Sequence, residues 1–244
     1  MKKIISTLFI SSLVAGSASA SVILNNSFES SFDDWTVVDT SANLSRNATD
    51  LGGATYHGDA TAGGGSALGA NRAFANLNGA GQSSSLTAFV YVDGTLDNTG
   101  TKETIAAGQY AFTMAIGNKD GGNSYDDNGD IELTLGYLTT ADDISSFTSF
   151  ESLSMTAVAV KTAITENTWA DITVIGTVLD TDVAIIGSQL AVQFTTTRTT
   201  VGVNNNNQTS FDYARVASVP EPSTYALLAG LFGLGHVMVR RRRS

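Results

Sequence analysis

The sequence predicts an all-β fold, a β-sandwich of the jelly-roll type, flanked by an N-terminal signal peptide and a short C-terminal transmembrane helix. Three observations lead to this fold class. Apolar and polar residues alternate with period two in several short segments, separated by Gly, Asn and Asp clusters. Proline is absent from residues 1–219, so nothing interrupts these segments. We find no internal repeat at a period of about 20–50 residues, which argues against a solenoid or a propeller.

The alternating segments are the predicted strands. Residues 110–116 (YAFTMAI) place four large apolar side chains on one face and small ones on the other, and residues 131–138 (IELTLGYL) follow the same pattern. Trp35 and Trp169 fall within apolar-patterned segments, so both are predicted core residues. Residues 41–78 are rich in Gly, Ala and Asn and predict loops and short strands at one end of the sandwich. The predicted strands are 86–92, 110–116, 131–138, 172–179, 189–196 and 209–216.

Residues 1–20 have the three parts of a secretory signal peptide. Two lysines precede an apolar stretch over residues 4–16, and Ala18 and Ala20 supply the small residues of an Ala-x-Ala cleavage site. The apolar stretch is too short for a retained anchor. We therefore expect signal peptidase to cut after Ala20, so that the mature chain begins at Ser21.

The C-terminal end consists of a short motif, an apolar run and a basic block, in that order. As a helix, the apolar run of residues 225–239 is about 22 Å long, against a hydrocarbon core of about 30 Å. Ser223, Thr224 and the arginine stems bring it to marginal spanning length. By the positive-inside rule, the basic block would lie on the cytoplasmic side of the membrane. Such a block at the end of the apolar run also argues against the alternative that the run is a buried core helix. The motif is Val219, Pro220, Glu221 and Pro222, and the block is Arg240, Arg241, Arg242 and Arg243.

This three-part tail resembles the PEP-CTERM sorting signal of Gram-negative bacteria, which membrane proteases called exosortases process. The resemblance implies an intermediate anchored in the inner membrane, cut by an exosortase-like protease near residues 220–222 and released to the cell surface or extracellular matrix. His236 and three glycines weaken the apolar run as a stable helix, which suits a segment that is held briefly. A tail that stays intact as a permanent anchor is the alternative.

Charge and cysteine content exclude several functions. Of 13 basic and 23 acidic residues, 7 and 22 fall between residues 21 and 219, a formal net charge of −15. Such a surface repels nucleic acid and anionic lipid. The chain has no cysteine, so disulfides, thiol catalysis and thiolate metal sites are ruled out.

A second resemblance, to carbohydrate-binding modules and galactose-binding-type jelly rolls, lies at the two ends of the mature domain. Residues 26–29 (NSFE), followed by Trp35, resemble the opening strand of those domains. Residues 210–216 (SFDYARV) resemble their closing strand, with Tyr213 at the position where Asn is customary. The order of the intervening strands also fits, so the resemblance covers nearly the whole mature chain.

In that family, a Glu after the first strand and an Asp in the last commonly hold a structural Ca²⁺. By position these are Glu29 and Asp212, with backbone carbonyls completing the oxygen shell. Such an ion would fasten together the two ends of a domain that has no disulfide. The alternative is that both carboxylates accept hydrogen bonds from N–H groups in turns.

An acidic loop over residues 120–130 offers a second and weaker calcium site. Asp126, Asn128 and Asp130 have the alternate spacing of a calcium loop. The EF-hand pattern then requires Gly where this chain has Ile131. Because the loop joins two predicted strands, a plain solvated hairpin is the favoured interpretation.

Few residues suggest catalysis, and we expect the mature domain not to be an enzyme. His57 is its one histidine, which limits a Ser-His-Asp triad to that base and leaves a zinc site short of ligands. Ser66 lies among glycines but lacks the second Gly of a nucleophile elbow. The 22 acidic residues still contain many pairs suited to glycoside hydrolysis, so a secreted hydrolase stays as an alternative.

Exposed aromatic side chains would be the groups that stack on sugar rings. The candidates are Tyr56, Tyr91, Tyr125 and Tyr137, of which only Tyr125 is exposed by its pattern. The threonine run at residues 195–200 occurs once and leads into an Asn tract, so it favours a strand entering a loop over an ice-binding ladder. The sequence identifies no ligand.

Three segments are therefore predicted: a signal peptide at 1–20, a β-sandwich at 21–217 and a sorting signal at 218–244. Within the last, the motif is 219–222, the transmembrane segment 223–239 and the basic tail 240–243. We expect an exported surface or matrix protein whose mature domain is structural or carbohydrate-interacting. The expected partners are signal peptidase, an exosortase-like protease, the inner membrane in passing, and an exopolysaccharide, but no nucleic acid. A structural Ca²⁺ is the one expected cofactor.

Overall fold

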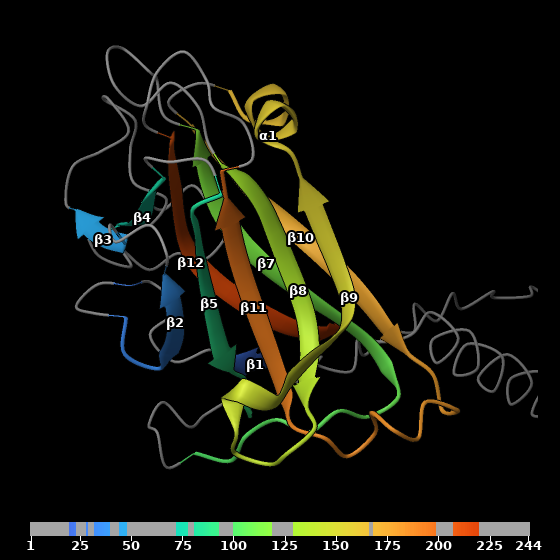
Figure 1. Cartoon of the computed structure of the whole chain (residues 1–244). Helices are drawn as coiled ribbons and strands as arrows, with labels where there is room; N and C mark the ends of the chain where they lie inside the picture. The colour runs from blue at the N-terminus through green and yellow to red at the C-terminus, as the bar shows by residue number, and fades with distance from the viewer. Residues whose placement is uncertain are drawn as a thin grey trace, which may run out of the picture.

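Two antiparallel sheets face each other across a shared core in this computed structural model (Figure 1). This architecture confirms the predicted all-β sandwich. The structure describes residues 20–22, 28, 32–39, 44–47, 72–77, 81–92, 100–118, 129–165, 168–198 and 207–219. Most of the predicted signal peptide, and the sorting signal beyond residue 219, lie outside these ranges.

The larger sheet has seven strands, five of them in the order β10-β7-β12-β1-β6. Strand β12 is its centre, because it pairs with β7 on one side and with both β4 and β1 on the other. Strand β3 pairs with the outer side of β4. The strands are β1 (Ala20–Val22), β3 (Leu44–Asn47), β4 (Arg72–Leu77), β6 (Tyr91–Val92), β7 (Gly108–Asn118), β10 (Thr168–Val178) and β12 (Asn207–Val219).

The smaller sheet has five strands in the order β2-β5-β11-β8-β9. Its inner face supplies the second half of the core, and the outward side chains of its central strands β8 and β11 are mostly polar. The strands are β2 (Trp35–Asp39), β5 (Ser83–Phe89), β8 (Asp130–Leu138), β9 (Phe147–Met155) and β11 (Leu190–Thr197).

Aromatic side chains from both sheets fill the middle of the core. The ring of Phe194 in the smaller sheet lies 4.7 Å from that of Phe211 in the larger. Phe28 packs against Phe211 and Trp35, at centroid distances of 5.4 and 5.3 Å. Burying each such side chain contributes about 1.5–3 kcal/mol. The core prediction for Trp35 is therefore confirmed, whereas Trp169 is half-buried.

All six predicted segments fall on strands of the structure, but two details of the prediction are wrong. Residues 86–92 are not one strand, since the chain leaves the smaller sheet at Val90 and continues as β6 in the larger sheet. Strands can switch sheets at a corner of a sandwich in this way. The acidic loop before Asp130 is not a hairpin, because β7 and β8 belong to different sheets.

Between β9 and β10 the chain forms a short helix, α1 (Ala157–Ala163), and a 3₁₀ turn, η1 (Ile144–Ser146), precedes β9. Alanine-rich sequence favours the helix, and the Thr156 hydroxyl caps it by accepting a hydrogen bond from the Ala159 N–H at 3.2 Å. Val160 anchors the helix in the core. Among the described residues, no helix is long and apolar enough to cross a membrane.

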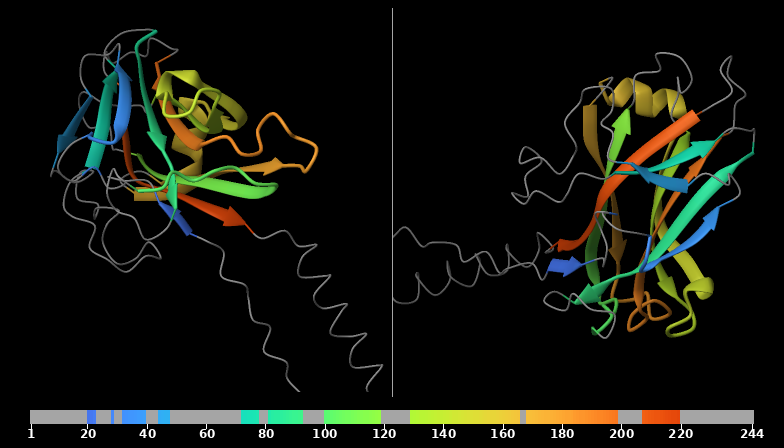
Figure 2. Two further views of the ribbon diagram at one scale, coloured as in Figure 1. Left: turned by 90° about the horizontal axis from the view of Figure 1, so that it is seen from below. Right: turned by 90° about the vertical axis from the view of Figure 1, so that its left-hand side faces the viewer.

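The first and last strands of the domain lie side by side (Figure 2). Ala20 pairs with Ala217 and Ser21 pairs with Val216, in antiparallel register. The start of β1 and the end of β12 therefore lie at the same end of the sandwich. Both predicted processing points are close to this pair of strands.

Candidate functional site

A groove of about 270 Å³ lies on the outer face of the smaller sheet, over β8, β9 and β11. Its lining within the described ranges is mostly hydroxyl and carboxylate side chains, with no aromatic ring. It consists of Asp130, Ile131, Glu132, Ser154, Met155, Thr156, Thr195 and Thr197. Such a lining offers many hydrogen-bond donors and acceptors to a polar ligand.

Strand register places these polar side chains in rows. Thr195 of β11 pairs with Glu132 of β8, and Glu132 pairs in turn with Ser154 of β9. Thr197 pairs with Asp130 one step further along. Because side chains two residues apart share a face, the groove has two adjacent rows of polar groups.

One of the two groove carboxylates is already used by the fold. Asp130 accepts a hydrogen bond of 2.7 Å from the backbone N–H of Ala157, the first residue of α1. A carboxylate at this position satisfies one of the free N–H groups of the helix start. Within the part of the chain that the structure describes, the Glu132 carboxylate forms no hydrogen bond or ion pair, so this side chain is the better candidate for a ligand contact.

The polar rows extend beyond the groove onto β5. The hydroxyls of Ser85 and Thr195 lie 3.1 Å apart, and Gln193 Nε2 donates to Thr87 Oγ1 at 2.9 Å. Cross-strand hydrogen bonds of this kind hold the polar side chains in fixed positions. The outer face of the smaller sheet is therefore an ordered hydroxyl and amide surface next to the groove.

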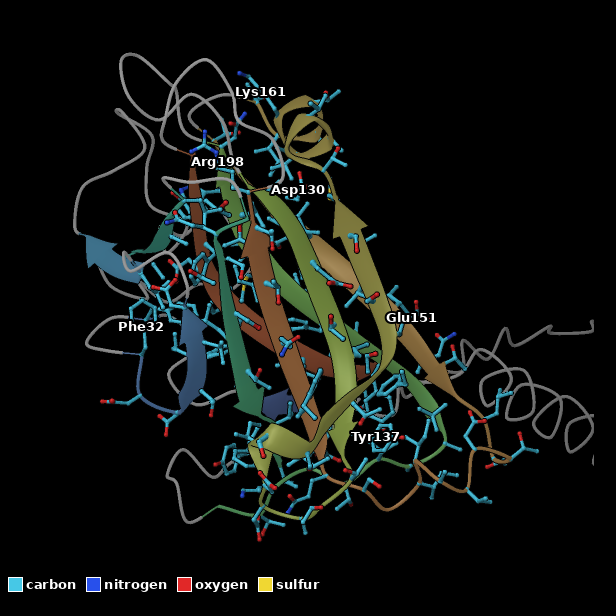
Figure 3. The ribbon with its side chains drawn as sticks, viewed as in Figure 1. Phe32, Asp130, Tyr137, Glu151, Lys161 and Arg198 are labelled. Carbon is cyan, nitrogen blue, oxygen red and sulfur yellow. The ribbon has the colours of Figure 1, made fainter. Side chains whose placement is uncertain are left out.

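The aromatic residues predicted to stack on sugars do not build this groove. Tyr91 is only 6% exposed, so its candidacy as a stacking platform is wrong. Tyr137 is half-buried and lies at the opposite end of β8 from Asp130 (Figure 3). Tyr56 and Tyr125 lie outside the described residues. The one sequence signal that falls in the groove is the threonine run at residues 195–200, because its first and third residues, Thr195 and Thr197, line the groove.

The predicted calcium residues are described only in part. Asp212 is 2% exposed, and its carboxylate accepts the N–H of Tyr213 at 2.8 Å. Glu29 lies outside the described residues, but its neighbour Phe28 packs on Phe211, the neighbour of Asp212. Asp126 and Asn128 of the acidic loop also lie outside them. Within the described ranges, no three His, Asp or Glu side chains gather closely enough to hold a metal ion.

Comparison with known proteins identifies the C-terminal end. The PEP-CTERM protein-sorting motif matches residues 218–243, the stretch recognised from its motif, apolar run and basic block. This motif marks an exported protein that an exosortase, a membrane protease, processes at the membrane before release to the cell surface. No curated protein matches the chain.

Solved structures share the sandwich fold at low sequence identity. The stig cyclase Fisc from Fischerella sp. TAU is 17% identical over 84% of this chain and 99% of its own, with a TM-score of 0.57. A second cyclase structure from Fischerella sp. TAU is 16% identical over 82% of this chain and 98% of its own, at a TM-score of 0.54.

A structure from work on carbohydrate-binding modules of the β-sandwich superfamily is also similar, although more weakly. It is 14% identical over 79% of this chain and 61% of its own, with a TM-score of 0.43, which carries no argument about function. The stronger similarities show the fold alone. Enzymes and binding domains share this fold, so the activity has to be argued from the site.

Proposed function

We propose that this chain is a non-enzymatic surface protein whose β-sandwich interacts with an extracellular polysaccharide through the groove on β8, β9 and β11. The sorting motif at residues 218–243 carries the export part of the proposal. The cell is a Gram-negative bacterium, and the intermediate is anchored in the inner membrane until an exosortase cuts near residues 220–222. The mature chain then runs from Ser21 to about Pro222.

The lining of the groove supports a polyhydroxylated ligand. Sugar hydroxyls both donate and accept hydrogen bonds, and Glu132, Ser154, Thr195 and Thr197 offer matching groups in two rows. A net charge of −15 over residues 21–219 favours a neutral or cation-bridged polysaccharide over a strongly anionic one. Without an aromatic platform, we expect weak binding that becomes useful when many copies act on one polymer.

Affinity electrophoresis through gels containing the exopolysaccharide of the source cell tests this proposal. The variants Glu132→Gln and Thr195→Val change the groove while keeping the size of each side chain, and Thr177→Val on β10 is the matched control on the other sheet. Retardation of the unmodified protein and of the control, with at least about a tenfold loss in the groove variants, is the expected result. Equal migration of all four proteins would overturn the binding role.

A secreted hydrolase is the second candidate, because Asp130 and Glu132 line the same open groove. Their Cα atoms are two residues apart on one strand, about 6.5–7 Å, which permits a carboxylate pair suited to glycoside hydrolysis. The use of Asp130 at the start of α1 weighs against this candidate. Release of reducing ends from the polysaccharide, abolished by Glu132→Gln, would replace the binding proposal with the enzymatic one.

We also propose a structural Ca²⁺ held by Glu29 and Asp212. The support is the burial of Asp212 in β12, beside the contact between Phe28 and Phe211 that joins the two ends of the domain. A bound ion would place a divalent cation beside this buried carboxylate, which favours its ionised form. Thermal unfolding in millimolar Ca²⁺ and in chelator, compared between the unmodified chain and Asp212→Asn, is the test. A melting temperature independent of Ca²⁺ would sink the proposal.

A further inference from the structure

The segment between β10 and β11 carries a cluster of exposed aliphatic side chains. Leu179 is 56% exposed, Val183 80% and Ile186 38%, and Ile175 in the last part of β10 is also exposed. We call Leu179, Val183 and Ile186 the apolar tip. Exposed aliphatic side chains gathered in one short loop mark a contact surface more often than scattered ones do.

The loop is ordered, so the apolar tip is a built feature. Asp182 Oδ2 accepts the N–H of Leu179 at 2.8 Å, and the Asp182 carbonyl accepts the N–H groups of Ile185 and Ile186 at 2.9 and 3.2 Å. Gly187 donates to the carbonyl of Ile105 at 2.8 Å, with the positive φ of 86° that Gly tolerates. These bonds fix the turn while Ile185 packs inward on the core.

The apolar tip lies at the end of the sandwich where the sorting signal begins. Gln109 of β7 pairs with Thr177 of β10 on one side and with Val219 of β12 on the other. Two inter-strand spacings, about 10 Å, therefore separate Thr177, near the end of β10, from Val219 at the end of β12. The start of β1 is at the same end, because Ala20 pairs with Ala217 (Figure 2). Helix α1 lies at the opposite end, at the top of Figure 1.

The length of chain after Val219 determines what faces this end. Only residues 220–222 separate Val219 from the predicted membrane segment at 223–239, and three fully extended residues reach at most about 10 Å. The headgroup layer on one side of a bilayer takes up about 5–8 Å of that distance. While the tail is in the membrane, this end of the sandwich must therefore lie against the lipid headgroups.

We propose that the apolar tip is a membrane-contacting surface that rests on the outer leaflet of the bilayer holding the sorting signal. The proposal rests on the anchored intermediate of the proposed function and adds an orientation to it. The domain stands on the membrane with Leu179, Val183 and Ile186 in the headgroup region and α1 pointing away. The site that the exosortase cuts is then held next to the bilayer surface.

Acidic side chains around the apolar tip limit the contact and select the lipid. Asp180 is exposed in the same loop, and Asp142 and Asp143 are exposed at the same end of the smaller sheet. Carboxylates resist entry into a headgroup layer and are repelled by anionic lipid. A shallow contact with zwitterionic headgroups follows, which three aliphatic side chains can make and which lets the domain leave once its tail is cut.

Single-cysteine labelling tests the orientation, because the natural chain has no cysteine. Val183→Cys is placed in the apolar tip, and Val158→Cys in α1 is the matched control, with native exposures of 80% and 75%. Each full-length variant carries an environment-sensitive fluorophore and is reconstituted into phosphatidylethanolamine–phosphatidylcholine vesicles, with and without nitroxide-labelled lipid. Vesicle flotation is measured on the same samples.

We expect both variants to float and only the label at position 183 to respond. Its emission shifts to shorter wavelength, its intensity rises by about twofold, and nitroxide lipid quenches it, as for a probe in the headgroup region. Flotation with equal signals at the two positions would overturn the orientation while leaving the anchored intermediate intact. Failure to float would overturn both. Adding anionic phosphatidylglycerol should reduce the response at position 183, and an increase would contradict the role given to the carboxylates.

Discussion

Tyr213 combines a costly backbone conformation with a useful side chain. Its φ is +47°, in the left-handed region, at a bulge where the pairing of β12 with β7 shifts between Asp212 and Arg215. The Arg215 guanidinium lies 5.0 Å from the Tyr213 ring and forms an ion pair with Asp171 across β7. The resembling family customarily has Asn here, a residue that tolerates this backbone conformation far better.

Replacing Tyr213 with Asn should therefore leave the stability of the domain unchanged or raise it slightly. The left-handed conformation costs about 1–2 kcal/mol for an ordinary residue, and loss of the exposed cation–π contact offsets about 0.5–1 kcal/mol of the gain. Urea unfolding should show Tyr213→Asn at or slightly above the stability of the natural chain, and Tyr213→Val clearly below it. Equal destabilisation by both would mean that the ring, and not the backbone, decides stability here.

Tyr110 ties the start of β7 to the segment before it. Its hydroxyl accepts the N–H of Ala106 at 2.8 Å and donates to the carbonyl of Ala106 at 3.1 Å, with the side chain 5% exposed. Tyr110→Phe removes both bonds and should lower the free energy of unfolding by about 1–2 kcal/mol. Denaturant unfolding at neutral pH measures this change. A loss below a few tenths of a kcal/mol would show that water replaces both hydrogen bonds.

Burial raises the pKa of Tyr110 above its usual value near 10. The folded state therefore favours the neutral phenol. The contribution of Tyr110 to the free energy of unfolding is complete below its pKa in the unfolded state, and it is lost as the pH rises through its pKa in the folded state. Part of the alkaline loss of stability above about pH 10 should disappear in Tyr110→Phe.

At the scale of strands, the two sheets come into close contact where β9 meets β10. A Cβ on Gly176 of β10 would lie 2.7 Å from a ring carbon of Phe150 and 2.9 Å from the Cβ of Glu151. Gly176→Ala should force the two edges apart and cost about 1–3 kcal/mol. Ile175→Ala, at the exposed neighbour, should change stability by less than about 0.5 kcal/mol. Similar melting temperatures for both variants would contradict this close approach.

A polar cluster joins three loops at the end of the sandwich opposite α1. Lys102 forms an ion pair of 2.5 Å with Asp142 and lies 3.6 Å from the ring centroid of Phe89. Gln189 donates to the same carboxylate at 3.1 Å, and its side-chain oxygen accepts the Asp142 N–H at 2.8 Å. Asp142 has a positive φ of 62°, so the cluster also holds a strained turn.

Hydrogen bonds from Lys102 and Gln189, together with the charge of Lys102, hold the pKa of Asp142 below its usual value of 3.8. A lowered pKa means stability that is present above the unfolded-state pKa and is lost as the pH falls through the folded one. Between pH 6 and about pH 3, the free energy of unfolding should therefore fall less steeply for Asp142→Asn than for the natural chain. Parallel curves would show that the cluster contributes nothing to acid stability.

The alternation of apolar and polar residues was enough to predict the central strands. It missed β9, because a bulge in that strand breaks the alternation. In β9 the large apolar residues Phe147, Phe150 and Leu153 are spaced by three and not by two, so no strand was predicted. The pairing explains this: Leu135 faces Glu151 and Gly136 faces Ser149, which leaves Phe150 as the extra residue of a bulge. The groove could not be predicted for the same reason, since it depends on β9.

At the scale of the whole molecule, the pairing of β1 with β12 places the two ends of the domain, which adjoin the two predicted cleavage sites, side by side. Both predicted membrane-engaged segments leave the domain at one end, next to the apolar tip. Sequence alone predicted the destination, because motif, apolar run and basic block are contiguous. It could not predict the orientation at the membrane, which depends on the register of β10, β7 and β12.

Cleavage at both ends is the central claim, and the intact mass of the native protein tests it most directly. The protein is taken separately from the medium and from the membrane fraction of exosortase-containing cells. We predict a released species with the mass of residues 21 to about 222, together with a minor membrane species that keeps the C-terminal tail. A membrane-bound protein that retains Arg240–Arg243 throughout, with no released form, would contradict the claim and make the tail a permanent anchor.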